Sequence, residues 1–135
     1  MITYLRHKAE LLRLESELVE CKIQKSIWME INDTETQFFY QTKINECAFK
    51  KENYLNNLLV LLTKTEITQQ NIQEIKCCYQ LIEQHSKSHY SLLFKAHLNK
   101  TIENYQKKYG DLLLKNQFKK AVEIEKIISN LESAA

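Results

Sequence analysis

Apolar side chains recur at helical spacing along almost the whole chain. They do so from residue 4 to 31 and again from 38 to 62, among helix-favouring residues such as Glu, Lys and Gln. This spacing places the apolar side chains on one face of an α-helix. A polar interval from Asn32 to Thr34 interrupts the pattern, and Thr34 followed by Gln37 is typical of a helix that begins there.

One heptad register nevertheless connects the two apolar segments. It places apolar residues at positions a and d on both sides of the interruption. These residues are Leu5, Leu12, Val19, Ile23, Ile44, Leu58 and Leu61. A register that survives the interruption favours one continuous helix with a polar middle from Ser26 to Gln37.

The second half of the chain holds another helical pattern behind a polar turn. Thr and Gln cluster from residue 63 to 70, and a threonine there can cap the helix that follows. Beyond this turn the apolar residues share one register as far as Ala96. The stripe shifts after Ala96 and is restored from Leu114 onward. We therefore expect the chain to turn near 63–70 and to return as a helix.

Two all-α architectures are compatible with these patterns. The shared register favours a long antiparallel two-helix coiled-coil hairpin that forms a single domain over residues 1–135. The alternative is a compact three- or four-helix antiparallel bundle with breaks near Asp33 and Gly110. In the hairpin, the coiled-coil seam would consist of Leu5, Leu12, Val19, Ile44, Leu58, Ile75, Ile82, Leu92, Ile124 and Ile128.

Composition supports long helices and removes one class of function. The chain has no proline, and Gly110 is its one glycine. Proline and glycine are the residues that most strongly interrupt helices, so their scarcity predicts few and long helices. A single glycine also excludes a glycine-rich phosphate-binding loop.

Charge and hydropathy narrow the choice of partners. The net charge of +2 is too small to predict a polyanion partner. Lysines alternate with Tyr105, Tyr109 and Phe118, but these aromatics sit at helical spacing and indicate a core, so we expect no nucleic-acid partner. No stretch reaches the ~20 apolar residues of a membrane span, and the N-terminus has no signal-peptide pattern. We expect a cytoplasmic protein.

Candidate chemistry is sparse. His85 and His89 are four residues apart and share a stripe with Cys78, and Cys47 would face them across the hairpin. Thiolates and imidazoles in such a set could bind zinc, whereas polar seam residues of a coiled coil explain them equally simply and are our preferred interpretation. No set of residues suits nucleophilic or acid–base catalysis, so we expect neither an enzyme nor a cofactor.

Two segments resemble a known family. They are Tyr-Leu-Arg-His-Lys-Ala-Glu-Leu-Leu-Arg-Leu-Glu-Ser-Glu-Leu (4–18) and Glu-Ile-Thr-Gln-Gln-Asn-Ile-Gln-Glu-Ile-Lys-Cys-Cys-Tyr-Gln-Leu-Ile (66–82). With the length and the scarcity of helix breakers, they are similar to the central stalks of type III secretion ATPases, of the flagellar FliJ and injectisome YscO/EscO type.

The resemblance implies a non-enzymatic stalk. Such a stalk binds and stimulates a hexameric ATPase and contacts export-gate or chaperone proteins. Carried over to this chain, it makes a set of basic residues near the two ends candidates for contacts with the ATPase pore. These are Arg6, Arg13, Lys119, Lys120 and Lys126. The alternative function is a helical-bundle adaptor or chaperone that binds a partner helix. A basic nucleic-acid-binding module is the third and weakest hypothesis.

Overall fold

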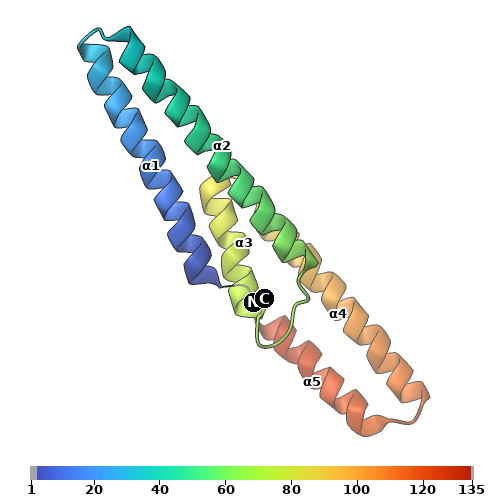
Figure 1. Ribbon diagram of the computed structural model, residues 1–135. Coiled ribbons are helices and arrows are strands. Elements are labelled where there is room, and N and C mark those ends of the chain that lie inside the picture. Colours follow the sequence, from blue (N-terminus) through green and yellow to red (C-terminus); the bar gives the residue numbers. More distant parts are fainter. Residues whose placement is uncertain (1–2, 135) are drawn as a thin grey trace. The chain divides into compact units, whose positions relative to one another are not determined.

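The computed structural model describes residues 3–134 and shows an all-α chain, which confirms the predicted fold class (Figure 1). Five helices follow one another, and none of the described residues forms a strand. They are α1 (Tyr4–Glu30), α2 (Thr34–Lys64), α3 (Ile72–Ser86), α4 (Tyr90–Leu114) and α5 (Phe118–Ala134). A two-helix hairpin is not confirmed, because five helices are present and both of the expected arms are interrupted.

The break between α1 and α2 has a clear local cause. Asn32 adopts a left-handed conformation with φ of 62°. The backbone N–H of Asn32 donates to the carbonyl of Met29, and that of Asp33 donates to the carbonyl of Trp28. This pair of hydrogen bonds defines a Schellman motif, which ends a helix. The continuous helix favoured by the heptad register is therefore wrong, and the break near Asp33 is confirmed.

Asp33 then starts α2. Its carboxylate accepts the backbone N–H of Thr36 at 3.0 Å, the geometry of a helix N-cap. This backbone hydrogen bond lowers the pKa of Asp33. The amide of Gln37 reaches back to the carbonyl of Trp28 at 3.3 Å, so a residue of α2 also contacts the open end of α1. Backbone groups at the end of α1 and at the start of α2 thus find hydrogen-bond partners within or next to this turn.

The turn between α4 and α5 repeats the same motif. Asn116 is left-handed with φ of 58°. Its backbone N–H donates to the carbonyl of Leu113, and the N–H of Gln117 donates to that of Leu112. Asparagine tolerates this conformation better than most residues with a side chain. The alternative bundle placed a break near Gly110; α4 continues through Gly110 to Leu114, and the break comes six residues later, at Asn116.

Gly110 lies inside α4, where glycine is unfavourable, and its replacement tests whether this position is helical. A Cβ atom added to Gly110 meets no atom within 4 Å. Glycine in a helix interior costs about 0.8–1.0 kcal/mol relative to alanine. We expect Gly110→Ala to raise the free energy of unfolding by about that amount and the melting temperature by a few degrees, as measured by circular dichroism. A loss of stability would contradict a helical Gly110.

The chain divides into two compact units. The first, Thr3–Val60, contains α1 and most of α2 as an antiparallel pair. His7 bonds to the hydroxyl of Tyr54 at 2.6 Å, and the Nζ of Lys25 donates to Gln41 at 2.5 Å, which fixes the register of the pair. The buried apolar side chains of this unit are Leu11, Leu14, Cys47, Leu55 and Leu58.

The second unit begins at Leu61 and contains α3, α4 and α5. These three helices contact one another pairwise, most extensively α4 with α5. Their core is denser in apolar residues than the first unit, because α3 alone buries six of its fifteen residues. The fully or almost fully buried side chains of this unit are Leu62, Ile67, Ile72, Ile75, Cys78, Tyr79, Leu81, Ile82, Leu98, Ala121 and Leu131.

The loop between α2 and α3 is held at both ends. Thr68 and Asn71 satisfy one another, since the backbone N–H of Thr68 donates to the Asn71 side chain at 2.7 Å and the N–H of Asn71 donates to the Thr68 hydroxyl at 3.3 Å. Between α2 and this pair, Ile67 is fully buried. This reciprocal arrangement works like a capping box and leads into α3.

Candidate partner-binding surface

A second apolar face of α1 is exposed. We call this set of residues the α1 stripe; it consists of Leu5, Leu12, Val19, Ile23 and Ile27. Successive members are seven, seven, four and four positions apart in the sequence, and each is at least 44% exposed. Residues seven apart on a helix differ by only ~20° around its axis, so the members of the stripe are aligned along one side of α1. Contiguous exposed apolar patches mark interaction sites in soluble proteins.

The opposite side of α1 carries the packed face. Leu11 and Leu14 are buried, and Leu18 and Cys21 are half-buried. Helix α1 is therefore apolar on two sides, one of which is covered and one of which is open. The three α1 residues of the predicted seam, Leu5, Leu12 and Val19, lie on the open side.

The other predicted seam residues are divided in the same way. Leu58 in the first unit is buried, as are Ile75, Ile82 and Ile124 in the second, whereas Leu92 is 65% exposed. The remaining members, Ile44 and Ile128, are half-buried. The residues that share a heptad register thus do not share one environment.

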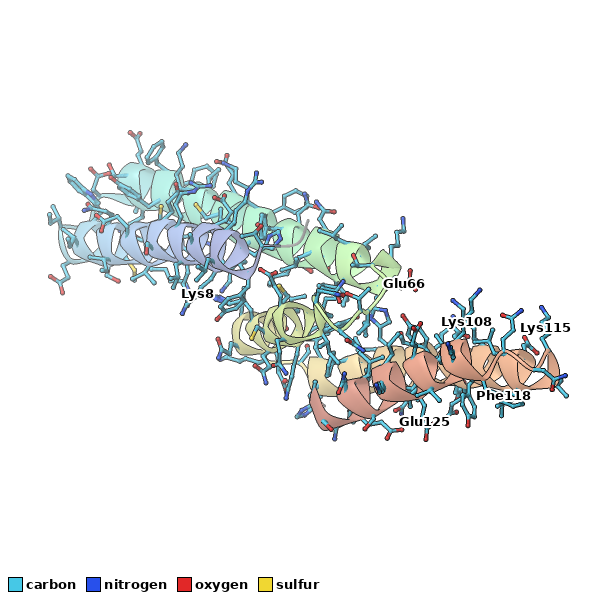
Figure 2. The ribbon with its side chains drawn as sticks, turned by 90° about the horizontal axis from the view of Figure 1, so that it is seen from below. Lys8, Glu66, Lys108, Lys115, Phe118 and Glu125 are labelled. Carbon is cyan, nitrogen blue, oxygen red and sulfur yellow. The ribbon has the colours of Figure 1, made fainter. Side chains whose placement is uncertain are left out.

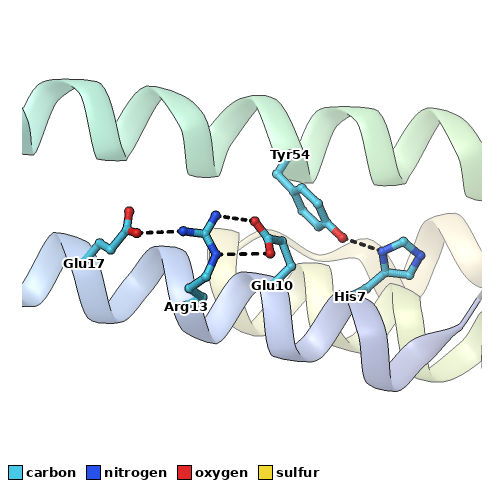
Figure 3. Close-up of polar contacts among 5 residues, drawn as sticks. All are labelled: His7, Glu10, Arg13, Glu17 and Tyr54. Atoms are coloured by element: carbon cyan, nitrogen blue, oxygen red, sulfur yellow. Dashed lines mark hydrogen bonds and ion pairs between the residues drawn. The ribbon is translucent and has the colours of Figure 1, made fainter.

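Polar side chains run along α1 beside its packed face (Figure 3). The guanidinium of Arg13 contacts Glu10 at 2.5 Å and Glu17 at 2.6 Å, one helical turn away on each side. The hydrogen bond from Arg13 lowers the pKa of Glu10, and the same bond raises the pKa of Arg13. Arg13 is therefore neutralised by its own helix, which leaves less of its charge for a partner.

Arg6 and Arg13 are brought together on the first unit. They line a surface hollow of about 390 Å³ with Ala9, Glu10 and Tyr54. The other predicted contact residues, Lys119, Lys120 and Lys126, are exposed on α5 in the second unit. The five basic residues thus form two sets on two units and can be tested separately.

The predicted zinc-ligand candidates do not assemble. His85 lies in α3, whereas His89 is the N-cap of α4, because Lys87 is left-handed with φ of 57° and ends α3. Burial raises the pKa of Cys78 to about 12, which keeps this thiol protonated. Among residues 3–134, no group of three His, Cys, Asp or Glu side chains is placed to hold a metal ion.

A partly buried polar cluster in the second unit was not indicated by the sequence pattern. The hydroxyl of Tyr79 on α3 lies 3.1 Å from Nδ1 of His97 on α4. The ring of Tyr79 also packs on Phe94, with centroids 5.7 Å apart. His97 in turn bonds to the backbone of Thr65, at the end of α2. The cluster joins three segments, and the three-residue spacing of Phe94 and His97 is the signal that could have indicated it.

His97 makes the stability of the chain depend on pH. Burial lowers the pKa of His97, and the positive charge of nearby Lys100 lowers this pKa further. The hydrogen bond to the backbone of Thr65 raises the pKa but only partly offsets the effect of burial. The unfolded chain therefore binds this proton more readily than the folded chain. The contribution of neutral His97 to the stability of the folded chain is complete above the ordinary histidine pKa of about 6.5. It is lost as the pH falls through the lowered pKa that His97 has in the folded chain.

We expect the free energy of unfolding in urea to fall between about pH 8 and about pH 5 by more in the wild type than in His97→Gln. Glutamine can accept from Tyr79 and donate to Thr65 without titrating in this range, which makes it the matched control. Equal pH dependence of the two proteins would show that His97 does not contribute.

No family model matches the chain, and neither a curated protein nor a solved structure is similar to it. Among the described residues, no helix is long and apolar enough to cross a membrane.

Proposed function

We propose that the chain is a non-enzymatic helical adaptor that binds an amphipathic helix of a partner protein along the α1 stripe. The single observation that carries this proposal is the exposed apolar stripe itself. A partner helix with its own apolar heptads can pack against residues at this spacing as in a coiled coil. The helix-in-groove and helix-on-helix modes of recognition both use such spaced apolar anchors.

In this proposal the two units have different roles: one provides stability and the other provides the binding surface. The second unit has the denser buried core and supplies stability, whereas α1 keeps a whole apolar side open in the first unit. Maintaining that open side carries a risk of aggregation, which a binding role explains. Both the adaptor and its partner would work in the cytoplasm, where the four free cysteines remain reduced.

A displayed library of helical peptides tests the adaptor. We expect selection on the wild type to enrich peptides with apolar a and d positions. Leu12→Asp with Val19→Asp should weaken their binding by about 100-fold or more, because two anchors are lost and two carboxylates would be desolvated. Phe49→Asp on α2 is the matched control, since Phe49 is 70% exposed and lies outside the stripe. Equal binding to all three proteins would reject the stripe as the site.

A second candidate function is the stalk of a type III secretion ATPase. The observation in its favour is the antiparallel pair of α1, with 27 residues, and α2, with 31 residues, most of which lies in the first unit. At 1.5 Å per residue these helices are roughly 40–46 Å long, the kind of element that can enter a ring pore. The segment 4–18, which carries part of the family resemblance, falls on α1. Partners would then include the ATPase and export-gate or chaperone proteins.

Purified secretion ATPase distinguishes the stalk from the adaptor. A stalk should stimulate ATP hydrolysis, and reversing Arg6 and Arg13 to glutamate should remove the stimulation if the first unit enters the pore. The reversal of Lys119, Lys120 and Lys126 tests the second unit in the same assay. No stimulation by the wild type would reject the stalk and leave the adaptor untouched.

A further inference from the structure

The turn between α4 and α5 projects apolar side chains into solvent. Leu114 is 86% exposed and Phe118 is 58% exposed, and Val122 follows Phe118 one turn along α5. Figure 2 shows Lys115 and Phe118 directed outward at this end of the helix pair. We call the segment from Leu113 to Val122 the hairpin tip. It is a convex apolar feature and not a groove, so it suits a deformable surface better than a rigid ligand.

Lysines surround the apolar residues of the tip. Lys115, Lys119 and Lys120 lie within it and are exposed, and Lys107 and Lys108 precede it on α4. Asp111 is the one acidic residue between residues 105 and 122. The first turn of α5 contains no acidic residue. Within the described part of the chain, the three tip lysines form no ion pair. The tip therefore combines a strong positive charge with exposed hydrocarbon.

The composition of the tip favours lipid over nucleic acid. Single-stranded nucleic acids need exposed aromatic rings on which bases stack. Tyr105 and Tyr109, the aromatics nearest the tip on α4, are half-buried, so Phe118 is the one aromatic ring that the tip exposes, and one ring cannot stack successive bases. The side chains that the tip offers are instead leucine, phenylalanine and valine beside lysine. Lysine can lay its hydrocarbon stem on an apolar surface while its ammonium group reaches a charged headgroup.

We propose that the hairpin tip docks on a membrane surface rich in anionic lipids. Leu114 and Phe118 enter the boundary between headgroups and acyl chains, and the three tip lysines bind the lipid phosphates and carboxylates. Peripheral attachment of this kind combines buried apolar area with electrostatic attraction. It requires no membrane-spanning helix, and it does not depend on either of the proposed functions.

Vesicle sedimentation with the full chain tests the proposal. We expect binding to anionic vesicles of phosphatidylcholine with about 30% phosphatidylserine, none to vesicles of pure phosphatidylcholine, and weaker binding as salt increases. Each lysine near such a surface is worth about fivefold in partitioning. Replacing Lys115, Lys119 and Lys120 by glutamine should therefore reduce binding by about 100-fold at low salt.

Matched variants separate the tip from overall charge and hydropathy. Replacing Lys95, Lys100 and Lys126 by glutamine removes the same charge outside the tip and should cost less than about tenfold. Leu114→Ser with Phe118→Ser should reduce binding by about tenfold or more, whereas Leu92→Ser should not change it. All of these side chains are exposed, so the helix content measured by circular dichroism should remain that of the wild type.

The depth of insertion gives an independent readout. In a Trp28→Phe background, which removes the one native tryptophan, a tryptophan in place of Phe118 should shift its emission to shorter wavelength with anionic vesicles and be quenched by lipids brominated on their acyl chains. Binding that ignores lipid charge, equal losses in tip and control variants, or no shift of the Phe118→Trp emission would each overturn the proposal. Failure to bind anionic vesicles at all would also overturn it.

Discussion

Tyr79→Ala is expected to lower the free energy of unfolding of the second unit by about 3–5 kcal/mol, the range for removing a buried aromatic side chain. Tyr79 is among the largest side chains that are fully buried in this chain. The substitution empties the space beside Phe94, and it also leaves His97 without its hydroxyl partner. Because the second unit has one small core, a destabilisation of this size would be a large fraction of its free energy of unfolding.

The Tyr79→Phe variant separates the two contributions. It keeps the ring against Phe94, whose centroid lies 5.7 Å away, and removes only the hydroxyl at 3.1 Å from His97. Loss of one such hydrogen bond costs about 0.5–1.5 kcal/mol. Urea unfolding followed by circular dichroism should therefore rank the wild type above Tyr79→Phe and both well above Tyr79→Ala. Equal stabilities of the two variants would contradict a packing role for the ring.

Ile82→Ala and Leu92→Ala should differ sharply although both residues belong to the same predicted seam. Ile82 is fully buried in α3, and its truncation should cost about 2–5 kcal/mol. Leu92 is 65% exposed near the start of α4, and its truncation should change stability by less than about 0.5 kcal/mol. A coiled-coil seam containing both residues would predict similar losses.

A second residue of α4 checks whether burial, and not the choice of helix, sets the difference between these two variants. Leu98 lies on the packed side of α4 and is almost fully buried. Leu98→Ala should therefore behave like Ile82→Ala, although it shares its helix with Leu92. Thermal melts of the three variants at equal concentration measure the effect. If Leu92→Ala proved as destabilising as Leu98→Ala, the buried face assigned to α4 would be wrong.

Helix type was readable from the sequence because it depends on local properties. Apolar spacing and the absence of proline act within a few residues, so they favour helix without any information about distant residues. The polar interval at Asn32 was visible for the same reason. Its effect was misjudged, because the heptad register runs through it unchanged while a left-handed asparagine with two backbone bonds still ends the helix.

Gly110 and Asn116 show how a helix end can be misplaced. Glycine is the more frequent residue at a helix C-terminus, so the alternative bundle placed its second break near Gly110. In the structure, Gly110 stays helical and Asn116 takes the left-handed conformation six residues later. Both residues permit an end to α4, and the hydrogen bonds that close the helix form at Asn116 and Gln117, not at Gly110.

Local pattern thus determined that this chain is helical and where its apolar residues recur, since helical spacing is a property of neighbouring residues. Tertiary structure alone decided which side of α1 is packed and which is open, and which seam candidates are core. The reason is that α1 carries apolar residues on two sides, so its own sequence suits either choice. Burial depends on which helices are its neighbours, and five helices in two units provide different neighbours from two helices in one hairpin.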